Sequence, residues 1–153
     1  MRGRFPAGRR VLRLATLCTA MVIVTGCVSS KPAEFFSTIG GPPRPFSSAV
    51  RANGFIFLAG QIGTDSSGAL VRGGIQAETR QTMNNIRDVL QRVGSSFDRV
   101  VKCTVFIGDM SEWAAMNEVY VTYFTAGKLP ARSALGANGL ALGARVEIEC
   151  IAH

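Results

Sequence analysis

One helical stripe constrains the fold of this chain more than any other feature. From residue 75 onward, apolar side chains recur at helical spacing and share one broad face: Ile75, Met83, Ile86, Val89, Leu90 and Val93. Gly94 follows, at the position where glycine commonly ends a helix. Because strand-like segments flank this stripe on both sides, we expect the helix to cover one face of a sheet.

The other segments complete an α+β pattern. Strands are predicted at residues 33–37, 46–50, 54–59, 99–108, 131–135 and 143–152. Asn53-Gly54 predicts a hairpin turn between the second and third of these strands. Asp109 and Glu112 have the spacing of a helix N-terminus, and the helix predicted after them has an aromatic stripe that core packing explains: Trp113, Met116, Tyr120, Tyr123 and Phe124. The fold class is therefore α+β, a mixed sheet with two helices on one face.

The first 26 residues have the pattern of an export signal. Five arginines precede an apolar run at 14–25, which is shorter than the roughly 20 residues of a transmembrane helix. The run ends in Val24-Thr25-Gly26-Cys27, which resembles the bacterial lipobox and implies cleavage before Cys27 and lipidation of that cysteine. An ordinary signal peptide and a chance cysteine are the alternatives. We expect a signal peptide at 1–26, a lipidated tether at 27–32 and one domain at 33–153.

This division also predicts the location of the protein and changes the meaning of its charge. Val28, and no aspartate, follows Cys27, so we expect an exported lipoprotein in the outer membrane, facing the periplasm. The whole chain has 17 basic and 10 acidic residues, a net charge of +7. Without the five leader arginines 12 basic residues remain, and the net charge falls to +2. Nucleic acid is therefore not an expected partner, because its binding needs a basic surface on the folded domain.

The residue inventory excludes several chemistries. The sole histidine is His153, which makes a Ser-His or Cys-His nucleophile and a histidine-rich zinc site improbable. No glycine-rich phosphate loop is recognisable, and we expect neither a metal nor a cofactor.

Cys103 and Cys150 both lie in predicted strands. They could pair in an oxidising compartment, but we favour two separate buried thiols.

Arg132 and the acidic strand after it form the candidate site. Arg132 begins a predicted strand, and its guanidinium can bind a planar carboxylate through two parallel hydrogen bonds. Glu147 and Glu149 alternate with apolar residues in the last strand, so they point to the same face. A glutamate near the arginine could position a water or move a proton. The pattern favours a small site for a carboxylate ligand.

Taken together, these segments resemble the RidA (YjgF/YER057c/UK114) family from about residue 46 to residue 152. The resemblance is carried by RPFSSAV, FIFLAGQI, the helix ending in LQRVG, VVKCTVFIGDM, WAAMNEVY, LPARS and VEIECIA. It implies a chorismate-mutase-like fold and a homotrimer with clefts between subunits. It also implies hydrolysis of reactive 2-imino acids and their enamine tautomers to 2-keto acids and ammonia.

The resemblance assigns roles to individual residues. Arg132 matches the arginine that binds the substrate carboxylate, and Glu147 matches the glutamate that orients or activates water. Glu149 is then a rim or interface charge. Four further positions match the cleft that binds the substrate: Asn117, Gly60, Ala134 and Phe46.

Three of the family's side chains are replaced. Phe46 stands where the family has tyrosine and Ala59 where it has serine, so two hydroxyls are lost. Ala134 replaces a frequent cysteine, a position that can act through its backbone carbonyl. These departures leave alternatives to the enzyme: a non-catalytic, lipid-anchored trimer that binds a small carboxylate or a partner protein, an endoribonuclease, which the charge disfavours, or a structural envelope protein.

Overall fold

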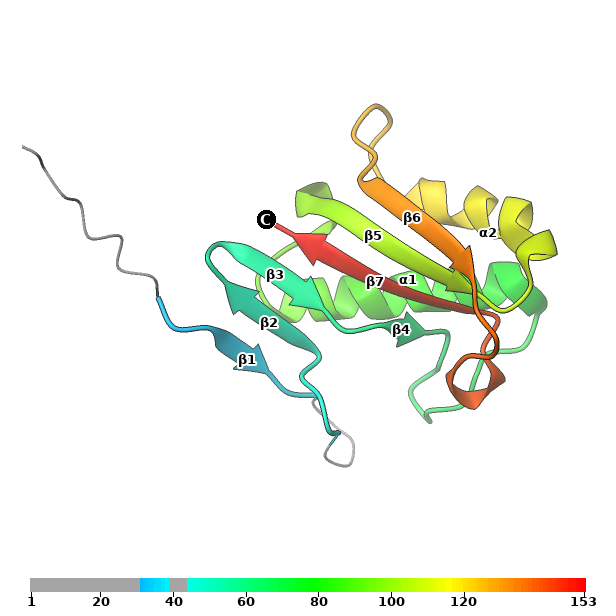
Figure 1. Cartoon of the computed structure of the whole chain (residues 1–153), viewed down its shortest axis with the longest axis horizontal. Helices are drawn as coiled ribbons and strands as arrows, with labels where there is room; N and C mark the ends of the chain where they lie inside the picture. Colours follow the sequence, from blue (N-terminus) through cyan, green and yellow to red (C-terminus); the bar gives the residue numbers. More distant parts are fainter. Residues whose placement is uncertain (1–30, 39–43) are drawn as a thin grey trace, which may run out of the picture.

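The computed structural model describes residues 31–38 and 44–153 (Figure 1). The predicted signal peptide, Cys27 and residues 28–30 of the predicted tether lie outside the described residues, as do residues 39–43. Within the described ranges, no helix is long and apolar enough to cross a membrane.

A seven-stranded mixed sheet forms one layer of the molecule. Its strands lie in the order β1-β2-β3-β7-β5-β6, and β4 pairs with β7 beside β3. All pairs are antiparallel except β5 with β6. The strands are β1 (Glu34–Phe36), β2 (Ala49–Ala52), β3 (Phe55–Leu58), β4 (Gln61–Ile62), β5 (Val100–Ile107), β6 (Ala131–Gly136) and β7 (Val146–Ala152).

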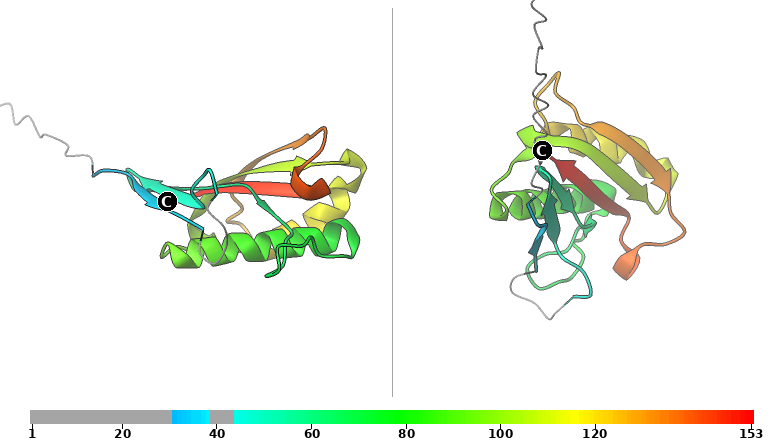
Figure 2. Two further views of the ribbon diagram at one scale, coloured as in Figure 1. Left: turned by 90° about the horizontal axis from the view of Figure 1, so that it is seen from below. Right: turned by 60° about the vertical axis from the view of Figure 1, so that its left-hand side comes forward.

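Two helices, α1 (Gly74–Arg92) and α2 (Trp113–Tyr120), form the second layer on one face of this sheet (Figure 2). The predicted stripe of α1 is buried along its whole length, and it packs with the inward residues of β5 and β7. The chain reverses at Gly94, whose φ is +71°, while Ser95 N–H donates to the Leu90 carbonyl at 2.8 Å. The predicted α+β architecture and the glycine end of the helix are confirmed.

Short 3-10 turns connect the larger elements: Phe97–Arg99, Met110–Glu112, Val121–Tyr123 and Ala141–Gly143. The turn at Met110–Glu112 corrects the predicted cap of the second helix. Asp109 caps this turn by accepting the Ser111 N–H at 2.9 Å, and α2 itself starts at Trp113. Glu112 does not reach back to Asp109, because Arg145 binds its carboxylate at 2.7 Å.

The strand predicted at 46–50 was placed too early. The ladder begins at Ala49 and runs to Ala52, and Phe46 lies before it with half of its side chain exposed. Prolines precede this point, and proline has no N–H for a ladder bond. The predicted Asn53-Gly54 turn does join β2 to β3, with φ values of +50° and +84°. Strand β4 was not predicted, because it is only two residues long.

A disulfide joins Cys103 to Cys150, so the prediction of two separate thiols was wrong. The antiparallel register of β5 and β7 sets the two residues directly opposite each other, with Cα atoms 4.1 Å apart. Both side chains are buried on the helix side of the sheet. A spacing of 47 residues along the chain does not reveal this register, which depends on strand pairing.

Candidate active site

Arg132 lies on the helix side of the sheet, at its edge. In the β5–β6 register it pairs with Cys103, which is fully buried beneath the helices. Side chains of neighbouring strands in register point to the same face, so Arg132 extends toward α2. Ala134, two residues on, points the same way and packs against the core.

The guanidinium of Arg132 is held by three residues of α2. It donates to the Asn117 side-chain oxygen at 2.6 Å. Its central carbon lies 4.8 Å from the centre of the Tyr120 ring and 5.7 Å from that of Trp113. Residues 113, 117 and 120 share one helix face because they are spaced by four and three. Arg132 forms no ion pair within the described ranges, so its fork is available to an anion.

Glu147 lies on the opposite side of the sheet. Its neighbours Val146 and Ile148 are fully buried on the helix side, so strand alternation turns Glu147 toward the open face. Glu149 shares that face and is exposed. Burial, and secondly the Glu149 charge, raise the pKa of Glu147 above its ordinary value. This carboxyl group is therefore suited to exchanging a proton.

Gly60 lies directly against the Glu147 carboxylate. A Cβ added at Gly60 would come 2.0 Å from Oε1 of Glu147 and 2.9 Å from Cδ, so any larger residue would displace the carboxylate. The Gln61 amide donates to the carbonyls of Ala59 and Gly60 at 3.1 Å each and fixes this bend. The absent side chain at Gly60 thus gives Glu147 its position.

The predicted site residues therefore form two separate half-sites in one chain. Arg132, Asn117 and Ala134 lie on the helix side, whereas Glu147 and Gly60 adjoin the open face. Among the described residues, Phe46 forms no hydrogen bond or ring contact with a residue of either half-site. It lines a separate polar groove, together with Gln61, and the guanidinium of Arg44 lies 5.8 Å from its ring.

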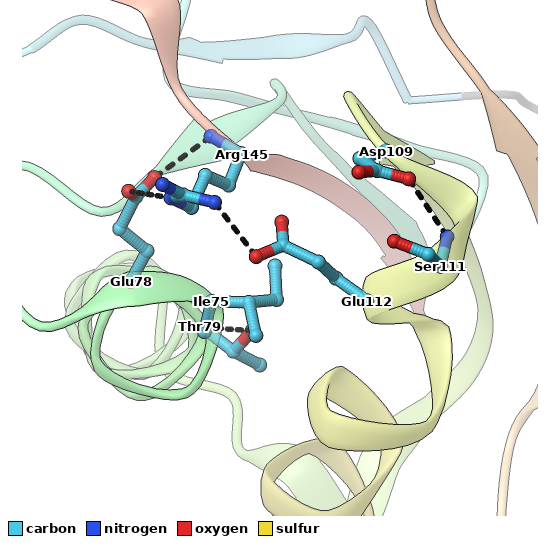
Figure 3. A network of polar contacts seen from close by, with 7 residues as sticks. All are labelled: Ile75, Glu78, Thr79, Asp109, Ser111, Glu112 and Arg145. Atoms are coloured by element: carbon cyan, nitrogen blue, oxygen red, sulfur yellow. Dashed lines mark hydrogen bonds and ion pairs between the residues drawn. The ribbon is translucent and has the colours of Figure 1, made fainter.

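Arg145 links the elements that carry the two half-sites (Figure 3). Its backbone N–H donates to the buried Glu78 of α1 at 2.8 Å, and its guanidinium reaches Glu78 at 3.6 Å and Glu112 at 2.7 Å. Because Arg145 immediately precedes β7 and Glu112 immediately precedes α2, these bonds tie both elements to α1. This network was not predicted from the sequence, because it joins residues that are far apart in the chain.

Two aromatic contacts of Arg132 were also missed. The stripe of the second helix was predicted to be core, and Met116 and Tyr120 are buried. The same Tyr120 nevertheless contacts the guanidinium, and Trp113 is only half-buried. These two contacts could have been predicted from the spacing of Trp113 and Tyr120 from Asn117, which places all three on one helix face. No group of three or more metal-ligating side chains gathers in the part of the chain that the structure describes.

Comparison with known proteins identifies relatives over most of the chain. The family described as Endoribonuclease L-PSP matches residues 40–153. The 2-iminobutanoate/2-iminopropanoate deaminase of Mus musculus is 46% identical over 128 residues, covering 82% of this chain and 94% of the mouse protein.

Two solved structures illustrate the shared fold. A protein of the conserved Rid family from Yersinia pestis is 36% identical, with a TM-score of 0.74 over 79% of this chain and 98% of its own. E. coli TdcF, solved with bound serine, is 28% identical, with a TM-score of 0.71 over 78% of this chain and 97% of its own.

Proposed function

The chain belongs to the RidA (YjgF/YER057c/UK114) family, described as Endoribonuclease L-PSP, and from this premise we propose that it hydrolyses 2-imino acids to 2-keto acids and ammonia. The enamine tautomers of these acids convert to the imine and are then hydrolysed in the same way. Relatives named as deaminases of 2-iminobutanoate and 2-iminopropanoate support this reaction, among them the mouse protein.

The observation that carries the proposal is the guanidinium of Arg132, which forms no ion pair with any of the described residues. Asn117 occupies one of its nitrogens, and the remaining N–H groups can bind both oxygens of a carboxylate. A 2-imino acid presents a planar carboxylate next to its electrophilic carbon. E. coli TdcF, a structural relative, was solved with bound serine, a small amino acid that carries a carboxylate.

The chemistry requires one water and one proton carrier. Glu147 takes a proton from water as the water oxygen bonds to C2 of the imine, and the C=N double bond becomes a single bond. The proton passes from Glu147 to the nitrogen. Glu147 then carries the hydroxyl proton of the tetrahedral intermediate to the nitrogen, and ammonia leaves as the C–O bond becomes a carbonyl. The raised pKa of Glu147 suits it to accept and return this proton.

A second copy of the chain is part of the proposal, because Arg132 and Glu147 lie on opposite sides of one sheet. We propose a homotrimer in which the Arg132 half-site of one copy meets the Glu147 half-site of the next. Large apolar side chains on the sheet support such contacts, since Phe57 and Leu135 are each 45% exposed. Closed symmetric assembly would repeat the same contact at every interface.

The location of the protein remains our proposal: an exported lipoprotein, anchored through Cys27 to the outer membrane and facing the periplasm. The leader pattern supports export. The Cys103–Cys150 disulfide supports it independently, because such bonds persist in oxidising compartments and are rare in the cytosol.

The test is acceleration of keto-acid formation from 2-iminobutanoate freshly released by a pyridoxal-phosphate dehydratase. We expect the wild type to accelerate it and Arg132→Ala to lose at least about tenfold in kcat/KM, because one charged hydrogen-bonded contact is removed. Arg80→Ala is the matched control, since Arg80 is exposed and its side chain has no polar partner among the described residues. Pyruvate binding that depends on Arg132, without turnover, would instead support the non-catalytic carboxylate-binding trimer that the Phe46 and Ala59 replacements suggest.

A further inference from the structure

The face of α2 that meets Arg132 consists of one amide and two rings. Asn117, one of the predicted substrate-binding residues, accepts a hydrogen bond from the guanidinium. The rings of Tyr120 and Trp113 lie 4.8 and 5.7 Å from the guanidinium carbon, within the range of a cation–π contact. Neither ring takes part in the reaction proposed above.

Tyr120 is fixed from behind by other aromatic residues. Its side chain is only 3% exposed, and its ring lies 4.9 Å from that of Phe124. Phe124 in turn packs edge-on against Phe97 at 5.3 Å. The Tyr120 hydroxyl is buried without a hydrogen-bond partner among the described residues. The ring, rather than the hydroxyl, is therefore the part of Tyr120 that contacts a functional group.

A ring can orient a guanidinium without consuming its donors. Arginine has a long side chain with several rotatable bonds, and ordering it on ligand binding weakens affinity. One hydrogen bond to Asn117 restrains one nitrogen of Arg132. An aromatic face restrains the whole cation and leaves the other N–H groups free for a carboxylate.

We propose that Tyr120 is a positioning residue that orients the Arg132 guanidinium for the substrate carboxylate, with Trp113 as the outer part of the same platform. The identity of the ligand rests on the function proposed above, whereas the platform is a property of the chain alone. The hydroxyl of Tyr120 has no part in it, so Tyr120→Phe retains the platform and Tyr120→Leu removes it.

The first test measures the order of Arg132 directly. In the full chain as its host processes it, ¹⁵N NMR would follow the Arg132 Nε–H signal, assigned with Arg132→Lys. We expect a ring-current shift and a rigid Nε–H in the wild type and in Tyr120→Phe, and the loss of both in Tyr120→Leu. Tyr123→Leu is the matched control, because it removes an aromatic ring from the neighbouring turn that packs against Phe97 and Arg87 and leaves the contact of Tyr120 with Phe124 in place. Equal order in Tyr120→Leu, or a mobile Arg132 in the wild type, would overturn the proposal.

A second test needs no change of shape in the core. Phenylalanine and increasingly fluorinated phenylalanines at position 120 weaken the negative face of the ring while nearly preserving its size. We expect KM for 2-iminobutanoate to rise stepwise, about threefold to tenfold over the series, with little change in kcat or in the thermal midpoint. A flat KM series in an active enzyme overturns the platform. A wild-type protein without any turnover would refute the proposed function instead. In that case the NMR signal of the Arg132 Nε–H, measured across the same series, would still test whether the ring orients the guanidinium.

Discussion

Glu147 is the residue whose surroundings most clearly suit a chemical step. Replacing it by Gln removes the proton carrier and retains the size of the side chain. We expect Glu147→Gln to lower kcat/KM by about a hundredfold or more, the usual contribution of a positioned general base. Glu149→Gln is the control, because Glu149 shares the strand and the face but is exposed. Equal losses in the two variants would mean that the open face needs negative charge rather than a particular base.

The pH dependence of activity follows from the same carboxyl group. Burial and the Glu149 charge raise the pKa of Glu147, and the group must be deprotonated to accept a proton from water. Activity should therefore fall as the pH drops through a value above the ordinary glutamate range. Glu149→Gln removes the like charge, so the acidic limb of kcat/KM should move to lower pH, though only in part, because burial is the larger cause. A limb that stays in place would contradict this coupling.

Gly60 and Gly63 lie close together in the chain, yet replacing each by alanine should have different effects, one on activity and the other on stability. A Cβ at Gly60 meets the far end of the flexible Glu147 side chain, which can move aside. We expect Gly60→Ala to retain its thermal midpoint and to lose activity. A Cβ at Gly63 meets the Glu78 backbone oxygen at 2.8 Å and Cα at 2.9 Å. Gly63→Ala should therefore lower the midpoint itself, as thermal unfolding of both variants would show.

At the scale of elements, helices and strands could be predicted where one hydrophobic period extends over a long segment. The stripe that ends at Gly94 predicted α1, and the alternation around Glu147 predicted β7. Features that depend on which strands pair, and not on a hydrophobic period, could not be predicted in this way. β4 is too short to show a period, and only the register of β5 against β7 brings Cys103 opposite Cys150. The division of the site between two faces is of the same kind, because it depends on which side of each strand is buried.

The disulfide between β5 and β7 should make a measurable contribution to stability. It closes a loop of 47 residues, for which the chain-entropy model gives about 4 kcal/mol. We expect a double Cys103→Ala, Cys150→Ala variant to lower the free energy of unfolding by up to about that amount. Denaturant titration of oxidised, reduced and double-variant protein would measure it. Identical curves for the oxidised and reduced forms would contradict the contribution.

At the scale of the whole molecule, the opposed half-sites predict complementation between damaged copies. Arg132→Ala and Glu147→Gln should each lose most of their activity alone. After unfolding and refolding them together in equal amounts, about a quarter of the sites at symmetric interfaces would pair an intact Arg132 with an intact Glu147. Recovery of about that share of wild-type activity is the expected result. No recovery, from a mixed trimer verified by native mass spectrometry, would mean that each site is built from one chain.

The position of Arg132 and Glu147 on opposite faces also determines how much activity is lost when normal and damaged copies assemble together. In a trimer, each copy would contribute to two neighbouring sites, one through each face. A copy damaged in only one of these residues would silence one site, and its neighbours would keep the other two working. A misfolded copy that still assembles would spoil both of its sites. In a bacterial cell that expresses a normal and a mutated gene copy together, damage to one of these residues should therefore lower activity less than damage that disturbs the whole sheet.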